Sequence, residues 1–236
     1  MTNLSPLLDG VVSQLAVRGD ALAVLSALPP ASVDAFVTDP PYGVGTKLGT
    51  TRRNRTLIRG DGKAEARRLW ARFVPLCERA AKPDTHHWFF GTWKSPWMAG
   101  ILADHFEVVG SVAWVKSQWG LGWPLQRRWE MLYLVRKGRP KCPARGDCDV
   151  WEHARDNVTD HPCRKPVPLM RRAIRTALPP EHRDPARPPL VVDPFAGVFS
   201  TGVAAVEEGC RFLGVELDRR YHALGEKRLD AAAGGA

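Results

Sequence analysis

Short apolar segments alternate with amphipathic ones along most of the chain. Seven apolar segments have the length of strands and are bounded by turn residues: 15–17, 33–38, 87–90, 108–115, 131–135, 190–192 and 212–215. Four segments carry apolar residues at three- and four-residue intervals, the spacing of helices: 64–80, 167–177, 200–208 and 218–231. This alternation predicts an α/β fold with a doubly wound, seven-stranded, mainly parallel sheet. The segments 43–61 and 138–163 interrupt the pattern, and we interpret both as loops able to contact a substrate.

Composition bounds the class of protein. With 236 residues, 44% of them hydrophobic, we expect a single domain spanning 1–236. No apolar run approaches the ~20 residues of a membrane span and the first residues do not resemble a secretory signal, so we expect a cytoplasmic protein of a prokaryotic or phage-infected cell. The formal charge of +9 favours a polyanionic partner, although charge by itself fits a solvated basic surface about as well.

The cysteines give no indication of a disulfide framework. Their number, five, is odd, and none forms a close C-x-x-C pair. A metal site would have to gather residues whose spacing fits no common ligand pattern, namely Cys142, Cys148, His153, His161 and Cys163. We therefore expect reduced thiols and no metal.

The tetrapeptide Asp39-Pro40-Pro41-Tyr42 directly follows the apolar segment 33–38. Two prolines fix the backbone there and leave carbonyls beside a carboxylate and an aromatic ring. The amine of adenine or cytosine is a poor nucleophile because its lone pair is delocalised into the ring. Asp39 and the Pro40 carbonyl can each accept one N–H and stabilise the developing ammonium, while Tyr42 stacks on the base. The motif therefore favours chemistry on an aromatic amine over the alternative, a strand-ending turn whose Asp caps a helix.

A second motif joins a strand to a helix through a glycine turn, in the run Val191-Val192-Asp193-Pro194-Phe195-Ala196-Gly197. The next strand ends in Glu216, about 20 residues beyond the glycine, the offset at which an acidic side chain reaches ribose hydroxyls in dinucleotide-binding folds. The turn lacks the G-x-G-x-x-G pattern of pyrophosphate sites. An adenosine-containing ligand without a pyrophosphate fits, which favours S-adenosylmethionine over NAD.

In these motifs and their order the chain resembles the amino-methyltransferases of DNA, in the permuted arrangement where the catalytic motif precedes the cofactor motif. The resemblance rests on Arg18-Gly19-Asp20-Ala21 followed by LSALPPASVDAFVTDPPY, on HPCRKPVPLMRRAI at 161–174, and on DPFAGVFSTGVAAVEEGCRFLGVELDRRY. It implies a Rossmann-like fold and methylation of adenine N6, because the family's cytosine-N4 enzymes more often have Ser in place of Asp39.

The resemblance also assigns site residues. It makes Asp39, Pro40, Pro41 and Tyr42 catalytic, and it implies that Asp20 meets the adenine of the cofactor, Glu216 its ribose and Lys165 its carboxylate. The whole cofactor-binding set that it implies is Asp20, Ala21, Lys165, Asp193, Pro194, Phe195, Ala196, Gly197, Ser200, Thr201, Gly202, Glu216 and Leu217.

The cofactor turn departs from the family's Gly-Ser-Gly-Thr. The chain reads Gly197-Val198-Phe199-Ser200-Thr201-Gly202, with a phenylalanine in place of the second glycine. If this position requires a positive φ, Phe199 is strained, which would weaken cofactor binding or re-route the loop. Open alternatives are a cytosine-N4 DNA methyltransferase, a catalytically weak nucleic-acid-binding subunit, and an enzyme that methylates RNA or a protein amide; the intact Asp39 and Tyr42 argue against the weak subunit.

Access to a base in double-stranded DNA requires that the base be flipped out of the duplex. We expect the basic run 50–55 to lie near phosphates, and Trp119 and Trp123 to be the candidates for stacking or duplex contact. Trp114 and Trp129 are assigned to the core. Because only 138–162 are free for target recognition, the sequence predicts a short target site or a homodimer.

Overall fold

One mixed sheet organises the protein, shown by a computed structural model that describes residues 3–45, 47–48, 56–57, 62–120, 124–141, 147–156 and 164–234. Its strand order is β1-β10-β9-β2-β5-β7-β6-β8. The strands are β1 (Gln14–Arg18), β2 (Ala35–Thr38), β5 (Thr85–Gly91), β6 (Glu107–Gly120), β7 (Arg127–Lys137), β8 (Val150–Glu152), β9 (Leu190–Asp193) and β10 (Arg211–Glu216). Strands β1, β10, β9, β2 and β5 are parallel, β7 is antiparallel to β5 and β6, and β8 is parallel to β6.

The seven predicted strands are all present, but among the described residues the sheet has eight, so the predicted strand number was wrong by one. The additional strand, β8, lies in the segment 138–163 that we interpreted as a loop. Three residues are too few to show a periodic pattern, and β8 is retained by tertiary packing: Trp151 is 1% exposed and its ring centroid lies 5.1 Å from that of Trp88.

In the other expected loop, 43–61, β3 (Lys47–Leu48) pairs with β4 (Thr56–Leu57). The rest of 43–61 is described only at 43–45, and residues 142–146 and 157–163 lie outside the described ranges.

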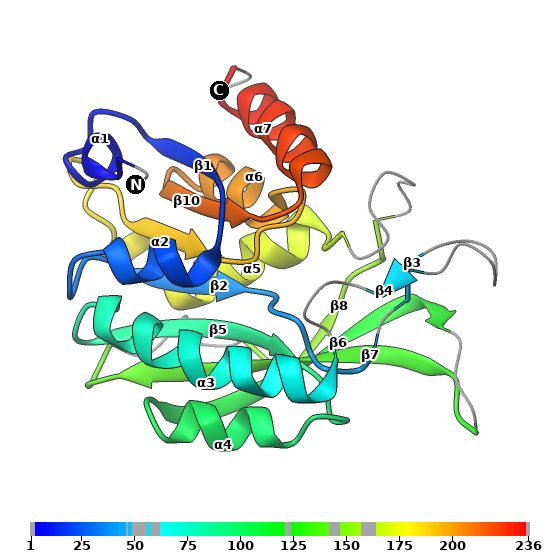
Figure 1. Cartoon of the computed structure of the whole chain (residues 1–236). Coiled ribbons are helices and arrows are strands. Elements are labelled where there is room, and N and C mark those ends of the chain that lie inside the picture. The colour runs from blue at the N-terminus through cyan, green and yellow to red at the C-terminus, as the bar shows by residue number, and fades with distance from the viewer. Residues whose placement is uncertain are drawn as a thin grey trace.

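Helices cover both faces of the sheet (Figure 1). They are α1 (Ser5–Leu8), α2 (Ala21–Ala27), α3 (Lys63–Ala80), α4 (Trp97–Ala103), α5 (Val167–Ala177), α6 (Ser200–Glu207) and α7 (Arg219–Gly234). The four predicted helices are α3, α5, α6 and α7, whereas α1, α2 and α4 are too short for the periodicity to reveal them. Within the described residues, none of the helices combines the length and apolar character needed to cross a bilayer.

Two separate cores confirm the doubly wound arrangement. Along β5, Phe89 packs into a core with α2, α3 and α4, while its neighbours Trp88 and Phe90 pack into a second core with α5, α6 and α7. Side chains that alternate along a strand point to opposite faces, so a continuous apolar run can fill both cores. The helices α3 and α6, which follow β2 and β9, lie on opposite faces, and this makes the β9–β2 boundary a topological switch point. Ligands of such sheets bind beyond the carboxyl ends of the strands at this point.

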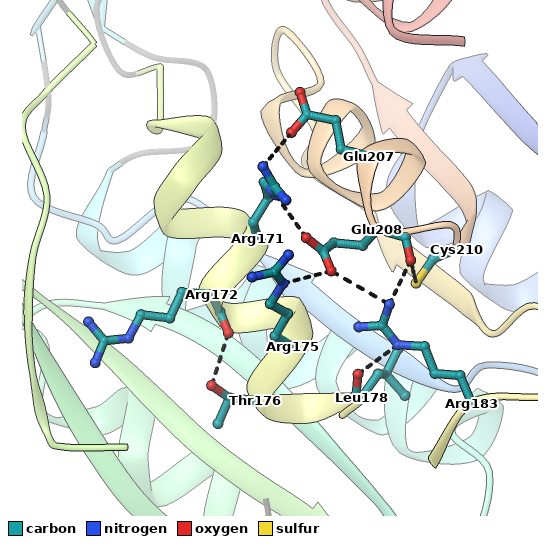
Figure 2. Close-up of polar contacts among 9 residues, drawn as sticks. All are labelled: Arg171, Arg172, Arg175, Thr176, Leu178, Arg183, Glu207, Glu208 and Cys210. Carbon is teal, nitrogen blue, oxygen red and sulfur yellow. Dashed lines mark hydrogen bonds and ion pairs between the residues drawn. The ribbon is translucent and has the colours of Figure 1, made fainter. Parts of the chain in front are cut away.

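An arginine cluster fixes α5 against α6 (Figure 2). The carboxylate of Glu208, 4% exposed, accepts hydrogen bonds of 2.8 Å from the Nε atoms of Arg171 and Arg175. Arg183 approaches the same carboxylate to 3.6 Å from the turn after α5. The helix α5 that this cluster holds begins just after Lys165.

Candidate active site

Four carboxyl groups lie in a row along one edge of the sheet. Asp20 follows β1, Glu216 ends β10, Asp193 ends β9 and Asp39 follows β2. These strands are parallel neighbours, so their carboxyl ends meet at the same edge. The fold therefore brings together the two motifs that the sequence predicts to be functional, on either side of the switch point.

The Asp39 carboxylate is held from two sides. It follows β2, whose four residues are all buried. The hydroxyl of Tyr42 donates a hydrogen bond to Asp39 Oδ1, and the ammonium of Lys165 forms an ion pair with Oδ2. Burial raises the pKa of Asp39 above its ordinary value, and the positive charge of Lys165 opposes this rise.

Two residues that the sequence analysis did not identify anchor the loop 39–42, which is predicted to be the catalytic loop. The indole Nε1 of Trp70, on α3, donates a 2.9 Å hydrogen bond to the carbonyl of Pro41. The hydroxyl of Ser95, which follows β5, donates a 2.7 Å hydrogen bond to the carbonyl of Tyr42. No described residue donates a hydrogen bond to the carbonyl of Pro40. This carbonyl is thus available as an acceptor next to Asp39, whereas the two carbonyls after it hold the loop in place.

Asp193 connects the cofactor turn to the catalytic strand. Its side chain is 2% exposed and accepts hydrogen bonds from the hydroxyls of Thr38, at 2.7 Å, and Thr201, at 2.6 Å. It also accepts from the backbone N–H of Phe195 at 3.1 Å. Burial raises the pKa of Asp193 to about 6, although the two hydroxyls oppose the rise. The carboxyl group of Asp193 therefore fixes the relative position of β2, the turn and the start of α6.

Glu216 closes the cofactor turn on its other side. Its Oε2 accepts from the N–H of Gly197 at 3.0 Å, and its Oε1 accepts from the N–H of Asp218 at 2.6 Å. Burial raises the pKa of Glu216, and these backbone donors lower it in part. Gly197 has a φ of 54°, which suits glycine. The glycine turn and the acid at the end of the next strand are thus in direct contact, whereas binding of a ribose by Glu216 stays a prediction.

The remaining members of the predicted cofactor set surround this turn. Asp20 caps α2 by accepting the N–H of Leu22 at 2.7 Å, and Phe195 packs edge-on against Phe73 with ring centroids 5.1 Å apart. Leu217 is 52% exposed beside Glu216. Buried members are Ala21 at the start of α2, Pro194 and Ala196 in the turn, and Ser200, Thr201 and Gly202 in the first turn of α6.

Phe199 adopts the left-handed conformation that the sequence analysis considered strained, with φ 57° and ψ 40°. Its ring is fully buried in the second core, with centroid distances of 6.1 Å to Phe212 and 5.7 Å to His222. It also occupies the space beside Gly225, where a Cβ would lie 2.6 Å from the ring. The side chain that replaces the family's glycine is therefore a core residue that packs against α7.

Lys165 lies beside the Asp39 carboxylate. Besides Asp39, its Nζ lies 3.2 Å from Oε2 of Glu130, on β7. Its contact with the carboxylate of the cofactor, which the resemblance implies, stays a prediction.

Beyond the catalytic edge, β6 and β7 continue as a two-stranded arm (Figure 1). Trp114 is 2% exposed, as expected of a core residue, but the assignment of Trp129 to the core was wrong because it is 40% exposed. β5 ends opposite Met131, so no strand of the described residues pairs with β7 on that side at Trp129. Trp119, on the arm, is 67% exposed, with the guanidinium of Arg128 5.8 Å from its ring centroid. Trp123 and the basic run 50–55 lie outside the described residues.

Comparison with known proteins covers nearly all of this architecture. A family model described as DNA methylase matches residues 33–227. The chain is 34% identical to the putative methylase YubD of Escherichia coli K12, over 91% of this chain and 89% of that protein. It is 24% identical to the DNA adenine methyltransferase YhdJ of the same strain, over 98% and 88%. Among solved structures, the cytosine-N4-specific PvuII DNA methyltransferase has a TM-score of 0.72 at 17% identity, over 92% and 86%, which confirms the predicted Rossmann-like methyltransferase fold.

Proposed function

The chain belongs to the family of N6/N4 DNA methylases, and we propose that it transfers a methyl group from S-adenosylmethionine to the N6 amine of adenine in double-stranded DNA. The observation that carries this proposal is the acceptor pair formed by the Asp39 carboxylate and the Pro40 carbonyl, directly across the switch point from the Asp193–Gly197 turn. Each acceptor takes one N–H of the amine, so that the nitrogen recovers its lone pair and its developing positive charge is stabilised.

The residues at the carboxyl ends of β1, β10 and β9 fit S-adenosylmethionine, which supplies an electrophilic methyl group. Arg18 and Glu216 are paired at the ends of β1 and β10, and Asp20 follows Arg18 by two residues, so the carboxylates of Asp20 and Glu216 lie at neighbouring strand ends. They offer acceptors for the amine and hydroxyl donors of an adenosine. Phe195 and Gly197 lie in the adjoining turn, where the positive φ of Gly197 is a conformation that suits glycine.

Adenine is favoured over cytosine because an aspartate stands first in the catalytic tetrapeptide and because YhdJ is named an adenine methyltransferase. Cytosine N4 is the second candidate, since the PvuII enzyme shares the fold. Both amines have the same geometry, so the acceptor pair by itself suits either base.

The arm of β6 and β7 is proposed to contact the DNA. It projects past the catalytic edge and exposes Trp119 and Trp129 together with Arg127 and Arg128 (Figure 1). Guanidinium groups neutralise phosphates, and exposed indoles stack on bases. Two protomers acting together would enlarge this surface, and sedimentation with and without duplex DNA tests such a homodimer. A DNA substrate also agrees with the expected cytoplasmic location in a prokaryotic or phage-infected cell.

The test is transfer of labelled methyl from S-adenosylmethionine to duplex DNA, followed by analysis of the nucleosides. We expect N6-methyladenine from the wild type and a rate about 100- to 1,000-fold lower for Asp39→Ala, since an acceptor for the developing charge is removed. Glu216→Gln should mainly raise the KM for S-adenosylmethionine. Asp230→Asn, an exposed carboxylate on α7, serves as the control. N4-methylcytosine as the product would refute the adenine assignment, and full activity of Asp39→Ala would refute the site.

A further inference from the structure

A chain of four charges, with its two lysines buried and its two carboxylates partly buried, ends on the Asp39 carboxylate. Asp39 pairs with Lys165, Lys165 lies 3.2 Å from Glu130, and the other oxygen of Glu130 pairs with Lys116 on β6. Lys165 is 8% exposed and Lys116 is 5% exposed. The signs alternate along the chain, and the four residues come from the catalytic loop, the start of α5, and the strands β7 and β6.

Aromatic rings complete the surroundings of both lysines. The ammonium of Lys165 lies 5.1 Å from the ring centroid of Phe90 and 5.8 Å from that of Tyr42. The ammonium of Lys116 lies 4.7 Å from the ring centroid of Trp114, the residue that faces Glu130 across the β6–β7 pair. The ammonium groups are therefore confined on several sides, which limits the positions that they can take.

A row of ion pairs such as this one contributes little net stability to a fold. Burying ion pairs costs desolvation free energy that their attraction often fails to repay, and apolar residues of similar volume commonly do as well or better. The charges here are not scattered, because they connect the start of α5 and the strands β7 and β6 to Asp39. Perturbed buried charges that converge on a reactive group are a mark of function.

We propose that Lys165, anchored by Glu130 and Lys116, is a positioning residue that keeps the Asp39 carboxylate charged and oriented toward the target amine. This inference rests on the proposed function. Lys165 binds Oδ2 and Tyr42 binds Oδ1, so each oxygen retains a lone pair for an N–H of the base. A protonated Asp39 would lose acceptor capacity at the moment when the amine needs it.

The electrostatics of the cluster agree with this role. Burial raises the pKa of Asp39, Lys165 lowers it, and the more distant Glu130 raises it again. Burial also raises the pKa of Glu130, but Lys165 and Lys116 outweigh it and bring the pKa to about 2, so Glu130 remains an anion over the working pH range. The other titratable groups that face the cluster are Tyr42 from the catalytic loop, Asp193 from β9 and Arg155 after β8.

The test measures the single-turnover rate of methyl transfer for the wild type, Lys165→Met and Lys165→Arg. The rate is measured at about ten pH values between about pH 5 and 9, with saturating cofactor. Removing the cation should lower the rate about 10- to 100-fold at neutral pH and move the acid limb of the profile up by about one pH unit, because Asp39 then retains its proton to higher pH. Arginine should restore most of the rate and the position of the limb. Lys137→Met, a lysine on β7 that pairs with Glu78 away from the site, should leave the profile unchanged.

A second measurement needs no activity. The carboxyl ¹³C resonance of Asp39, assigned by its loss in Asp39→Asn, should titrate at higher pH in Lys165→Met than in the wild type. If the single variant does not fold, Lys165→Met/Glu130→Gln removes one charge of each sign and should show the same direction, since Lys165 affects Asp39 more strongly than Glu130 does. An unshifted Asp39 titration in a folded variant overturns the inference. A wild type that transfers no methyl to DNA, with a shifted titration, would instead refute the proposed function alone.

Discussion

Phe199 and Gly225 form a pair in which an unfavourable backbone conformation is retained through packing. Phe199 is left-handed and fully buried, and a Cβ on Gly225 would lie 2.6 Å from its ring. Gly225 is inside α7, where alanine is otherwise the better residue. We therefore expect the effect of Gly225→Ala on stability to change sign with the residue at position 199.

The magnitudes follow from the contacts. In the wild type, Gly225→Ala gains about 0.5–1 kcal/mol of helix stability but overpacks the core at a cost of about 1–3 kcal/mol, so the free energy of unfolding should fall by about 1 kcal/mol. Phe199→Gly loses about 3–5 kcal/mol of buried ring and relieves about 1–2 kcal/mol of left-handed strain, a net loss of about 2–3 kcal/mol. Without the ring, Gly225→Ala should raise the free energy of unfolding by about 1 kcal/mol.

Urea unfolding of the wild type, both single variants and the double variant gives these four free energies, and the expected coupling is about 2 kcal/mol. Gly100→Ala is the matched control, because a Cβ on this glycine of α4 would meet no atom within 4 Å. It should stabilise both backgrounds equally. The same sign for Gly225→Ala in both backgrounds would refute the claim that the two residues compete for one space.

Two further outcomes are expected. Glu208→Gln should lower the free energy of unfolding by about 2 kcal/mol and the Tm by about 4–8 °C. This loss is smaller than for a fully buried ion pair, because Arg175 is half exposed. The control is Glu207→Gln, which changes an exposed carboxylate and should change the Tm little (Figure 2). Burial alone would raise the pKa of Glu208, but its arginine partners hold this pKa below the ordinary value. The stability that Glu208 contributes is therefore fully present above the pKa that a glutamate has in the unfolded chain, and it is lost as the pH falls. Equal Tm differences between wild type and Glu208→Gln at pH 7 and in acid would contradict this. Ser95→Ala should slow methyl transfer about five- to tenfold through the lost hydrogen bond to Tyr42 and lower the Tm by only about 2–4 °C. An unchanged rate would show that the loop does not need this anchor.

Features set by local pattern could be predicted from the sequence. The bounds of α5 agree with the predicted 167–177, and the catalytic tetrapeptide does follow a strand buried on both faces. The left-handed Phe199 was also foreseeable, because a backbone conformation required by a turn does not depend on the side chain that occupies it. Each of these depends on neighbours within a few residues along the chain.

Features set by the order of the strands were decided only in the tertiary structure. Lys165 and Asp39 are 126 residues apart in the chain, and only the packing of α5 beside β2 makes them partners. The three-residue β8 and the exposure of Trp129 likewise depend on which strand lies alongside and where that strand ends. Hydrophobic periodicity specifies which face of an element is buried, but not which distant side chain it will meet there, because many strand orders bury the same faces equally well.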